Sequence, residues 1–155
     1  MYEKVLVPLD GSELSECVFP HVKAFIEGCQ VGYVVFVRVV EPAPIISGPE
    51  EFIISPELLE GMESARKSAA KNYLDQVIKR FQHEGTALHS EILFGRAAES
   101  LADYRKENDI DLVIIATHGR SGVTRWVRGS VADKVLRFSS IPVLMVRAPG
   151  TKEGI

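Results

Sequence analysis

Apolar residues in this chain form short runs, and the segments between the runs show helical spacing. The runs are too short for helices and predict five strands, at residues 4–9, 31–40, 86–94, 111–116 and 141–147. The intervening spacing predicts helices from residue 12 toward residue 28, over 56–84, over 95–108 and from residue 130 onward. This alternation predicts an α/β fold, in which an open doubly wound parallel sheet carries helices on both faces, and argues against a barrel or a bundle.

Prolines and small polar residues predict where the first two helices begin. Ser12 is the expected N-cap of the first helix, and Pro20 should either kink that helix or mark a late start. The longest helix has Ser55 as its expected N-cap, Pro56 at its first position and Gly85 as its terminator. Residues spaced three and four apart predict one buried stripe along it, made of Met62, Ala65, Ala69, Tyr73, Val77 and Phe81.

The remaining segments predict one domain with a long loop and a short tail. Residues 41–56 contain four prolines and one glycine, which is typical of a loop. This loop also contains five large apolar residues, so we expect it to cover the core or a ligand, with a partner interface as the alternative. We expect the domain to span residues 1–148 and the tail, 149–155, to be flexible.

Composition narrows the class of protein. The net charge of -3 provides no electrostatic footprint for nucleic acid, and no apolar run reaches the length of a membrane span. Cys17 and Cys29 form no CxxC pair, and the histidines have no zinc-ligand spacing. We expect the first residues to form a strand rather than a leader segment. We therefore expect a cytoplasmic protein that binds neither nucleic acid nor membranes.

The residues most typical of a binding site lie between the fourth strand and the last helix. A turn over 117–122 contains two glycines, and Gly129-Ser130 directly precedes a helical segment. Glycines allow a backbone to approach a ligand closely, and a helix that begins at Ser130 would direct free N–H groups and the positive end of its dipole to the same place. This combination predicts a phosphate site, although Ser130 could also serve only as a cap, paired with Asp133.

Parallel strands would bring other residues to the same place. Ligands bind an open α/β sheet outside the carboxyl ends of its strands, where the strand order reverses. The first strand ends at Asp10, the second near Val39 and the fourth at Ala116. If the first and fourth strands flank the reversal, a carboxylate, an apolar wall and a phosphate cradle lie within one nucleotide's length. Asp10 could alternatively only begin a turn, because Asp-Gly-Ser is a common turn sequence.

With these motifs, the chain resembles the nucleotide-binding, or ATP-binding, type of the universal stress protein family. The resemblance rests on residues 5–12, on Gly95-Arg96-Ala97-Ala98-Glu99, and on the family's glycine signature. That signature is Gly, two residues, Gly, nine residues, then Gly followed by Ser or Thr. Gly119, the nine residues 120–128 and Gly129-Ser130 match it, whereas Ala116 stands where the family usually has its first glycine.

The resemblance implies a Rossmann-like sheet in the strand order 3-2-1-4-5 and a homodimer formed through the last strand, residues 141–147. It implies ATP, ADP or AMP as the ligand, with Mg²⁺ bound only through the phosphates. The implied contacts are Pro8 and Asp10 with the adenosine, Val39 as an apolar neighbour, Ile115 and Ala116 along the base and ribose, and Gly119, Gly129, Ser130 and Val131 with the phosphates.

Three functions remain open at this point. The first is a stress-response regulator that binds adenine nucleotides and hydrolyses ATP slowly or not at all, because no Walker lysine, metal-binding carboxylate pair or positioned general base is present. The second is a dimeric interaction module that no longer binds nucleotide, which Ala116 favours. The third is a nucleotidyl transferase or ATP pyrophosphatase, whose usual signatures are missing from residues 8–12. We identify no catalytic residue and no metal ligand.

Overall fold

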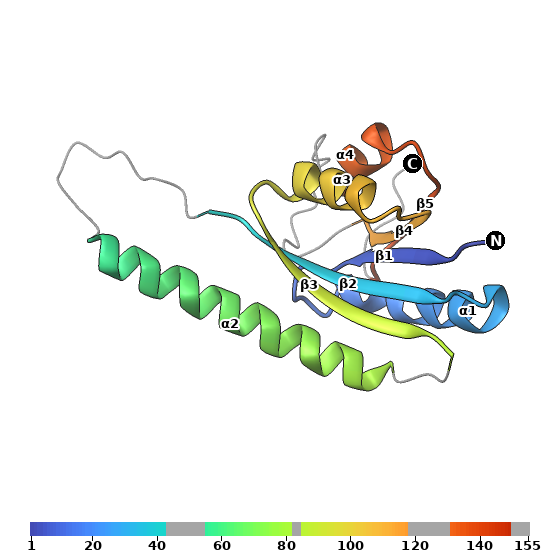
Figure 1. The fold of residues 1–155 in the computed structure, drawn as a ribbon, viewed down its shortest axis with the longest axis horizontal. Coiled ribbons are helices and arrows are strands. Elements are labelled where there is room, and N and C mark those ends of the chain that lie inside the picture. The colour runs from blue at the N-terminus through green and yellow to red at the C-terminus, as the bar shows by residue number, and fades with distance from the viewer. Residues whose placement is uncertain (43–54, 82–84, 118–130, 150–155) are drawn as a thin grey trace.

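The protein folds around a single five-stranded sheet (Figure 1). The structure is a computed structural model that describes residues 1–42, 55–81, 85–117 and 131–149. Its elements are β1 (Lys4–Pro8), the 3₁₀ helix η1 (Ser15–Val18), α1 (Phe19–Cys29), β2 (Tyr33–Val40), α2 (Pro56–Arg80), β3 (Ala87–Phe94), α3 (Ala97–Glu107), β4 (Leu112–Ala116), α4 (Val131–Phe138) and β5 (Val143–Val146).

The sheet has the strand order β3-β2-β1-β4-β5, and all four strand pairs are parallel. Val5 in β1 aligns with Val34 on one side and with Leu112 on the other, so the strand order reverses at β1. The predicted α/β class and the order 3-2-1-4-5 are therefore confirmed.

Two helices cover each face of the sheet (Figure 1). On one face, α1 and α2 pack against β1, β2 and β4 around the fully buried Phe36, Leu74 and Ile114. On the opposite face, α3 and α4 pack over Leu6, Val35 and Val113. The central strands are buried on both faces, which explains why their sequences are nearly continuous apolar runs rather than alternating ones.

The start of the first helix differs from the prediction. The α-helix begins at Phe19 with Pro20 in its first turn, so Pro20 marks a late start and not a kink. Ser12 is not the N-cap of this helix. Its hydroxyl instead accepts a hydrogen bond from the backbone N–H of Ser15 (3.2 Å), the first residue of the short 3₁₀ helix. A serine can satisfy a local turn as readily as a helix terminus.

The buried stripe predicted along α2 is only partly correct. Ser55 caps the helix as predicted, since its hydroxyl accepts a hydrogen bond from the Leu58 N–H (3.2 Å). Residues 55–69 are all exposed, however, and Met62, Ala65 and Ala69 among them are not buried. The buried residues of α2 are Ala70, Leu74 and Val77, while Tyr73 and Phe81 are half-buried.

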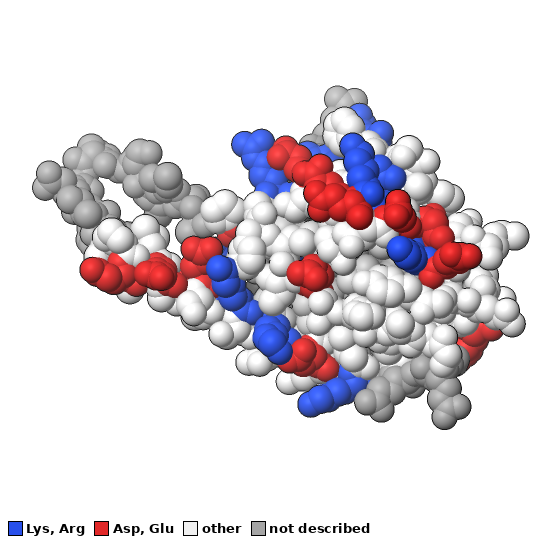
Figure 2. Space-filling model, in the orientation of Figure 1, with Lys and Arg blue, Asp and Glu red and all other residues white. Residues whose placement is uncertain are grey.

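The geometry of α2 explains this difference. Its 25 residues span about 38 Å at the standard helical rise, whereas the eight residues of β3 span about 26 Å. The N-terminal half of α2 therefore extends past the sheet (Figure 1). Charged side chains gather along the outer surfaces of α2 and α3, with a mostly uncharged surface between them (Figure 2).

Candidate ligand cavity

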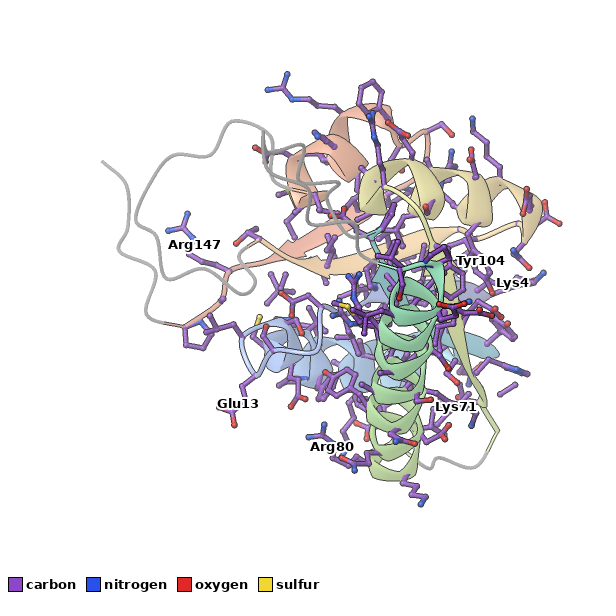
Figure 3. The ribbon with its side chains drawn as sticks, turned by 90° about the vertical axis from the view of Figure 1, so that its left-hand side faces the viewer. Lys4, Glu13, Lys71, Arg80, Tyr104 and Arg147 are labelled. Atoms are coloured by element: carbon purple, nitrogen blue, oxygen red, sulfur yellow. The ribbon has the colours of Figure 1, made fainter. Side chains whose placement is uncertain are left out.

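A cavity of about 250 Å³ opens at the carboxyl ends of β1, β2 and β4. This is close to the lower end of the usual size range for small-molecule sites. The cavity lies where the strand order reverses, the position at which open α/β sheets bind ligands. Figure 3 views the molecule from the carboxyl ends of the strands, with Glu13 in the loop that follows β1.

Six of the nine residues predicted to contact a ligand line this one cavity. They come from β1 and its following loop, from β2, from β4 and from the start of α4, and they are Pro8, Asp10, Val39, Ile115, Ala116 and Val131. The other three predicted residues, Gly119, Gly129 and Ser130, lie outside the described residues. Residues distant in the sequence thus converge at one place, as the strand endings predict.

A hydrogen-bonded turn holds Asp10 at the cavity. The Oδ1 atom of Asp10 accepts hydrogen bonds from the Ser12 N–H (2.8 Å) and from the Ser12 hydroxyl. The hydroxyl of Ser15, which also lines the cavity and is buried, donates to the Ser12 carbonyl (2.8 Å). Gly11 adopts φ +82°, a backbone angle that favours glycine. Asp10 therefore does begin a turn, and the turn places its carboxyl group beside the cavity.

Ala116 occupies the position of the family's first glycine without apparent backbone strain. It is the last residue of β4 and pairs with Val146 in β5. Among the described residues other than glycine, only Gln30 and Asp109 have a positive φ. The backbone here does not require glycine, so the consequence of Ala116 is confined to its methyl group. Ala116 lines the cavity and also packs against the core between the sheet and the α1/α2 layer.

Besides Ser15, two further polar residues that sequence reasoning missed line the cavity, Arg38 and Thr117. Arg38 lies near the carboxyl end of β2, between Val37 and Val39, and its isolated charge in an otherwise apolar strand was the available signal. The Thr117 hydroxyl is buried and has no hydrogen-bond partner among the described residues. Such a group is costly when left unpaired and is commonly explained by a missing partner. No sequence pattern distinguishes it.

The remaining wall comes from α3 and α4. Ala97 and Leu101 of α3 and Ala132 of α4 line the cavity. The first N–H of α3 is already used, because Ala97 donates to the Glu41 carboxylate (3.2 Å). Gly95, directly before this helix, adopts φ +126°, and a Cβ there would lie 3.0 Å from the Ser100 hydroxyl. This contact gives the glycine of the Gly95–Glu99 motif a structural reason.

The cavity wall is also joined to α2. Directly after Ser15, Glu16 accepts hydrogen bonds from the Tyr73 hydroxyl (3.0 Å) and from both terminal nitrogens of Arg80 (2.9 and 3.1 Å). Figure 3 shows Arg80 near the C-terminal end of α2. Burial, and then the neighbouring Glu16 carboxylate, raise the pKa of Tyr73 above its ordinary value. The phenol is thus a neutral hydrogen-bond donor that helps to fix η1 on α2.

Cys17 shows no sign of an activated thiol. It lies in η1, and burial raises the pKa of its thiol, which disfavours the reactive thiolate. Within the described ranges, no group of three or more His, Cys, Asp or Glu side chains could hold a metal ion. The described helices include none that is long and apolar enough to cross a membrane.

The fold and the cavity define a class of protein, an open parallel α/β domain with a cavity at the reversal of its strand order. Within this class, the model of the "Universal stress protein family" matches residues 1–147. The chain belongs to the universal stress protein family.

Curated relatives support this assignment. Universal stress protein MJ0531 of Methanocaldococcus jannaschii is 29% identical over 153 residues, which cover 96% of this chain and 84% of that protein. Universal stress protein YxiE of Bacillus subtilis is 28% identical, and the match covers 95% of this chain and 100% of that protein.

Solved structures resemble the whole chain. That of protein MJ0577 has a TM-score of 0.81 and 27% identity, and the match covers 97% of this chain and 99% of that one. A universal stress protein in complex with cAMP has a TM-score of 0.64 at 18% identity, covering 95% and 98% of the two chains. An Arabidopsis thaliana family member with AMP bound has a TM-score of 0.66 at 14% identity, covering 96% and 93%. At such low identity, the last two show a shared fold.

Proposed function

We propose that this protein is a stress-response regulator that binds an adenine nucleotide in the cavity at the ends of β1 and β4. The observation that carries the proposal is the convergence of the predicted contacts, since all six that the structure describes line one cavity. The cAMP and AMP complexes of proteins with this fold support an adenine nucleotide as the ligand.

The chemistry of the walls suits the parts of a nucleotide. Pro8, Val39 and Ile115 offer apolar surface to a purine. The Asp10 carboxylate is a hydrogen-bond acceptor suited to hydroxyl or amino groups of an adenosine. The first turn of α4 begins at Val131 on the cavity wall, and the positive end of a helix dipole favours phosphate there.

We propose ligand-modulated regulation rather than rapid catalysis. The sequence provides binding groups but no positioned general base or Walker lysine, and Mg²⁺ would be bound through the phosphates of ATP or ADP. Rapid cleavage of ATP in a single-turnover experiment would overturn this part of the proposal.

We further propose that the regulator acts as a homodimer through the last strand, residues 141–147. In the single chain, β5 lies at one edge of the sheet, and its apolar Val143, Leu144 and Met145 are only half-buried. An apolar edge strand is prone to pair with another chain, and a two-fold contact would cover it. Sedimentation at micromolar concentration should give the mass of a dimer, and a monomer would contradict the proposal.

Calorimetry with ATP, ADP and AMP tests the nucleotide itself. We expect saturable binding of at least one of the three. The second candidate function, a dimeric interaction module that binds no nucleotide, is favoured by the methyl group of Ala116 in the cavity. Absence of heat with all three nucleotides at millimolar concentration, together with a dimer mass, would decide for that candidate.

A further inference from the structure

We propose that Arg38 gives the cavity its preference for charged ligands, so that it selects nucleotides over the corresponding neutral nucleosides. This inference rests on the proposed nucleotide binding, and it assigns the discrimination to a residue outside the family's glycine signature.

The position of Arg38 supports this role. It precedes Val39 in β2 and lines the same cavity as Asp10. Its guanidinium group lies against the turn after β1, because a Cβ added to Gly11 would be 3.6 Å from Nε, 3.8 Å from Cζ and 3.9 Å from Nη2. These are ordinary van der Waals distances, so the guanidinium lies directly beside the turn that holds Asp10.

The surroundings of Arg38 distinguish it from an ordinary surface arginine. Every other residue of β2 is apolar or aromatic, and Arg38 is only half-exposed. A charge in such a place is screened less by solvent than one on an open surface, and its desolvation has to be offset by nearby polar or charged groups. Its charge is therefore felt by a ligand in the cavity more strongly than a fully exposed charge would be.

The charge balance of the cavity shows why this matters. Among the described lining residues, Asp10 and Arg38 are the two that carry a full charge. The Asp10 carboxylate repels a phosphate group while it can still accept hydrogen bonds from an adenosine. The guanidinium of Arg38 offsets that repulsion within the same wall. Removing it should therefore penalise AMP strongly and adenosine weakly.

The test compares the dissociation constants of AMP and adenosine by calorimetry in the full chain, with Arg38→Gln and a matched control. The control is Arg66→Gln, which removes the same charge from an exposed position on α2, away from the cavity. For Arg38→Gln we expect about a tenfold loss of AMP affinity and less than a twofold change for adenosine. Arg38→Lys keeps the charge and should retain most of the preference, and Arg66→Gln should match the wild type.

The outcomes separate the two proposals. If the wild type binds AMP but Arg38→Gln weakens AMP and adenosine equally, or neither, the role of Arg38 is overturned and nucleotide binding stands. If the wild type binds no nucleotide, both proposals fail. Should Arg38→Gln not fold, Arg38→Met keeps the apolar stem of the side chain and takes its place, with the same expected ratios.

Discussion

An aspartate lies beside each end of β1, Asp111 at the amino end and Asp10 at the carboxyl end, and the two differ in what they bind. At the amino end, Asp111 directly precedes β4 and accepts hydrogen bonds from the backbone N–H groups of Glu3 (2.8 Å to Oδ2) and Lys4 (3.2 and 3.3 Å). The Lys4 ammonium donates to the Asn108 carbonyl nearby (3.2 Å). At the carboxyl end, Asp10 lies in a turn on the wall of a cavity.

This difference shows how the amino and carboxyl ends of the strands in a parallel sheet differ. At the amino end, both oxygens of Asp111 are occupied by the protein's own main chain, which fastens β1 to the start of β4. At the carboxyl end, the strands diverge toward helices on opposite faces, and a space remains between them. The same residue type therefore joins two strands at one end and begins a turn on the cavity wall at the other.

The largest effect expected from this comparison is on stability. Asp111→Ala removes a charged acceptor from two backbone donors, so we expect the free energy of unfolding to fall by about 2–3 kcal/mol. Urea denaturation measures it. Asp103→Ala, at an exposed position on α3, is the control and should change the stability by less than about 0.5 kcal/mol. Nucleotide affinity should stay within about twofold of wild type in both variants.

At the carboxyl end we expect the reverse, a larger effect on nucleotide affinity than on stability. Asp10→Ala should weaken nucleotide binding at least about tenfold, because a charged hydrogen-bond acceptor contributes roughly 1.5–3 kcal/mol. Loss of the turn contacts with Ser12 should lower the stability by about 1 kcal/mol, less than Asp111→Ala does. Calorimetry and urea denaturation report the two quantities. Unchanged affinity combined with a stability loss as large as that of Asp111→Ala would erase the distinction between the two ends.

A third experiment uses the hydroxyl of Thr117, which has no hydrogen-bond partner within the part of the chain that the structure describes. Thr117→Val removes this group at nearly constant volume, so the ligand-free protein should become more stable by about 1 kcal/mol. If the hydroxyl serves the ligand, nucleotide affinity should fall a few-fold at the same time. Thr86→Val is the matched control, since the Thr86 hydroxyl donates to the Val31 carbonyl (2.9 Å) and its loss should be destabilising. If Thr117→Val were destabilising, as Thr86→Val should be, the Thr117 hydroxyl would have a partner in the ligand-free protein.

The smallest effect concerns the departure from the family's glycine signature. Ala116→Gly should lower the stability by about 0.5–1 kcal/mol, the usual cost of glycine in a strand. Affinity should rise up to a few-fold, because a methyl group leaves the cavity wall. Ala87→Gly, in β3 and away from the cavity, should show a similar stability loss with no gain in affinity. Weaker binding in Ala116→Gly would mean that the methyl group contributes to the site.

The sequence predicts the sheet well because its signals are local and redundant. Each buried strand is a continuous apolar run, and Ser55 with Pro56 marks the start of α2 correctly. Pro20 marks a late start of α1, one of its two predicted roles. Ser12 was predicted wrongly as the N-cap, because a serine makes similar hydrogen bonds in a turn and at a helix terminus. The stripe along α2 was predicted too long because periodicity does not reveal where the sheet beneath a helix ends.

The cavity could be predicted only in part for a related reason. Strand endings identify Pro8, Asp10 and Ile115, because residues that follow parallel strands meet at one edge. Arg38 and Thr117 depend on which way a side chain turns at that edge and on whether a hydroxyl finds a partner. Both are properties of tertiary packing. The isolated charge in an apolar strand was a signal for Arg38, whereas the sequence contains no pattern that distinguishes Thr117.

Because α2 extends past the sheet, its two halves should differ in how often their backbone hydrogen bonds open. Its C-terminal half opens only when the core opens, because Leu74 and Val77 are fully buried there. Residues 56–66 are exposed and contain Gly61, where an added Cβ would meet no described residue within 4 Å beyond the backbone of its own helix. Short helical segments without tertiary packing fray readily in water. Amide hydrogens in these first turns should exchange with solvent orders of magnitude faster than those near Leu74, and a protease should be able to cleave the chain there while the cavity stays assembled.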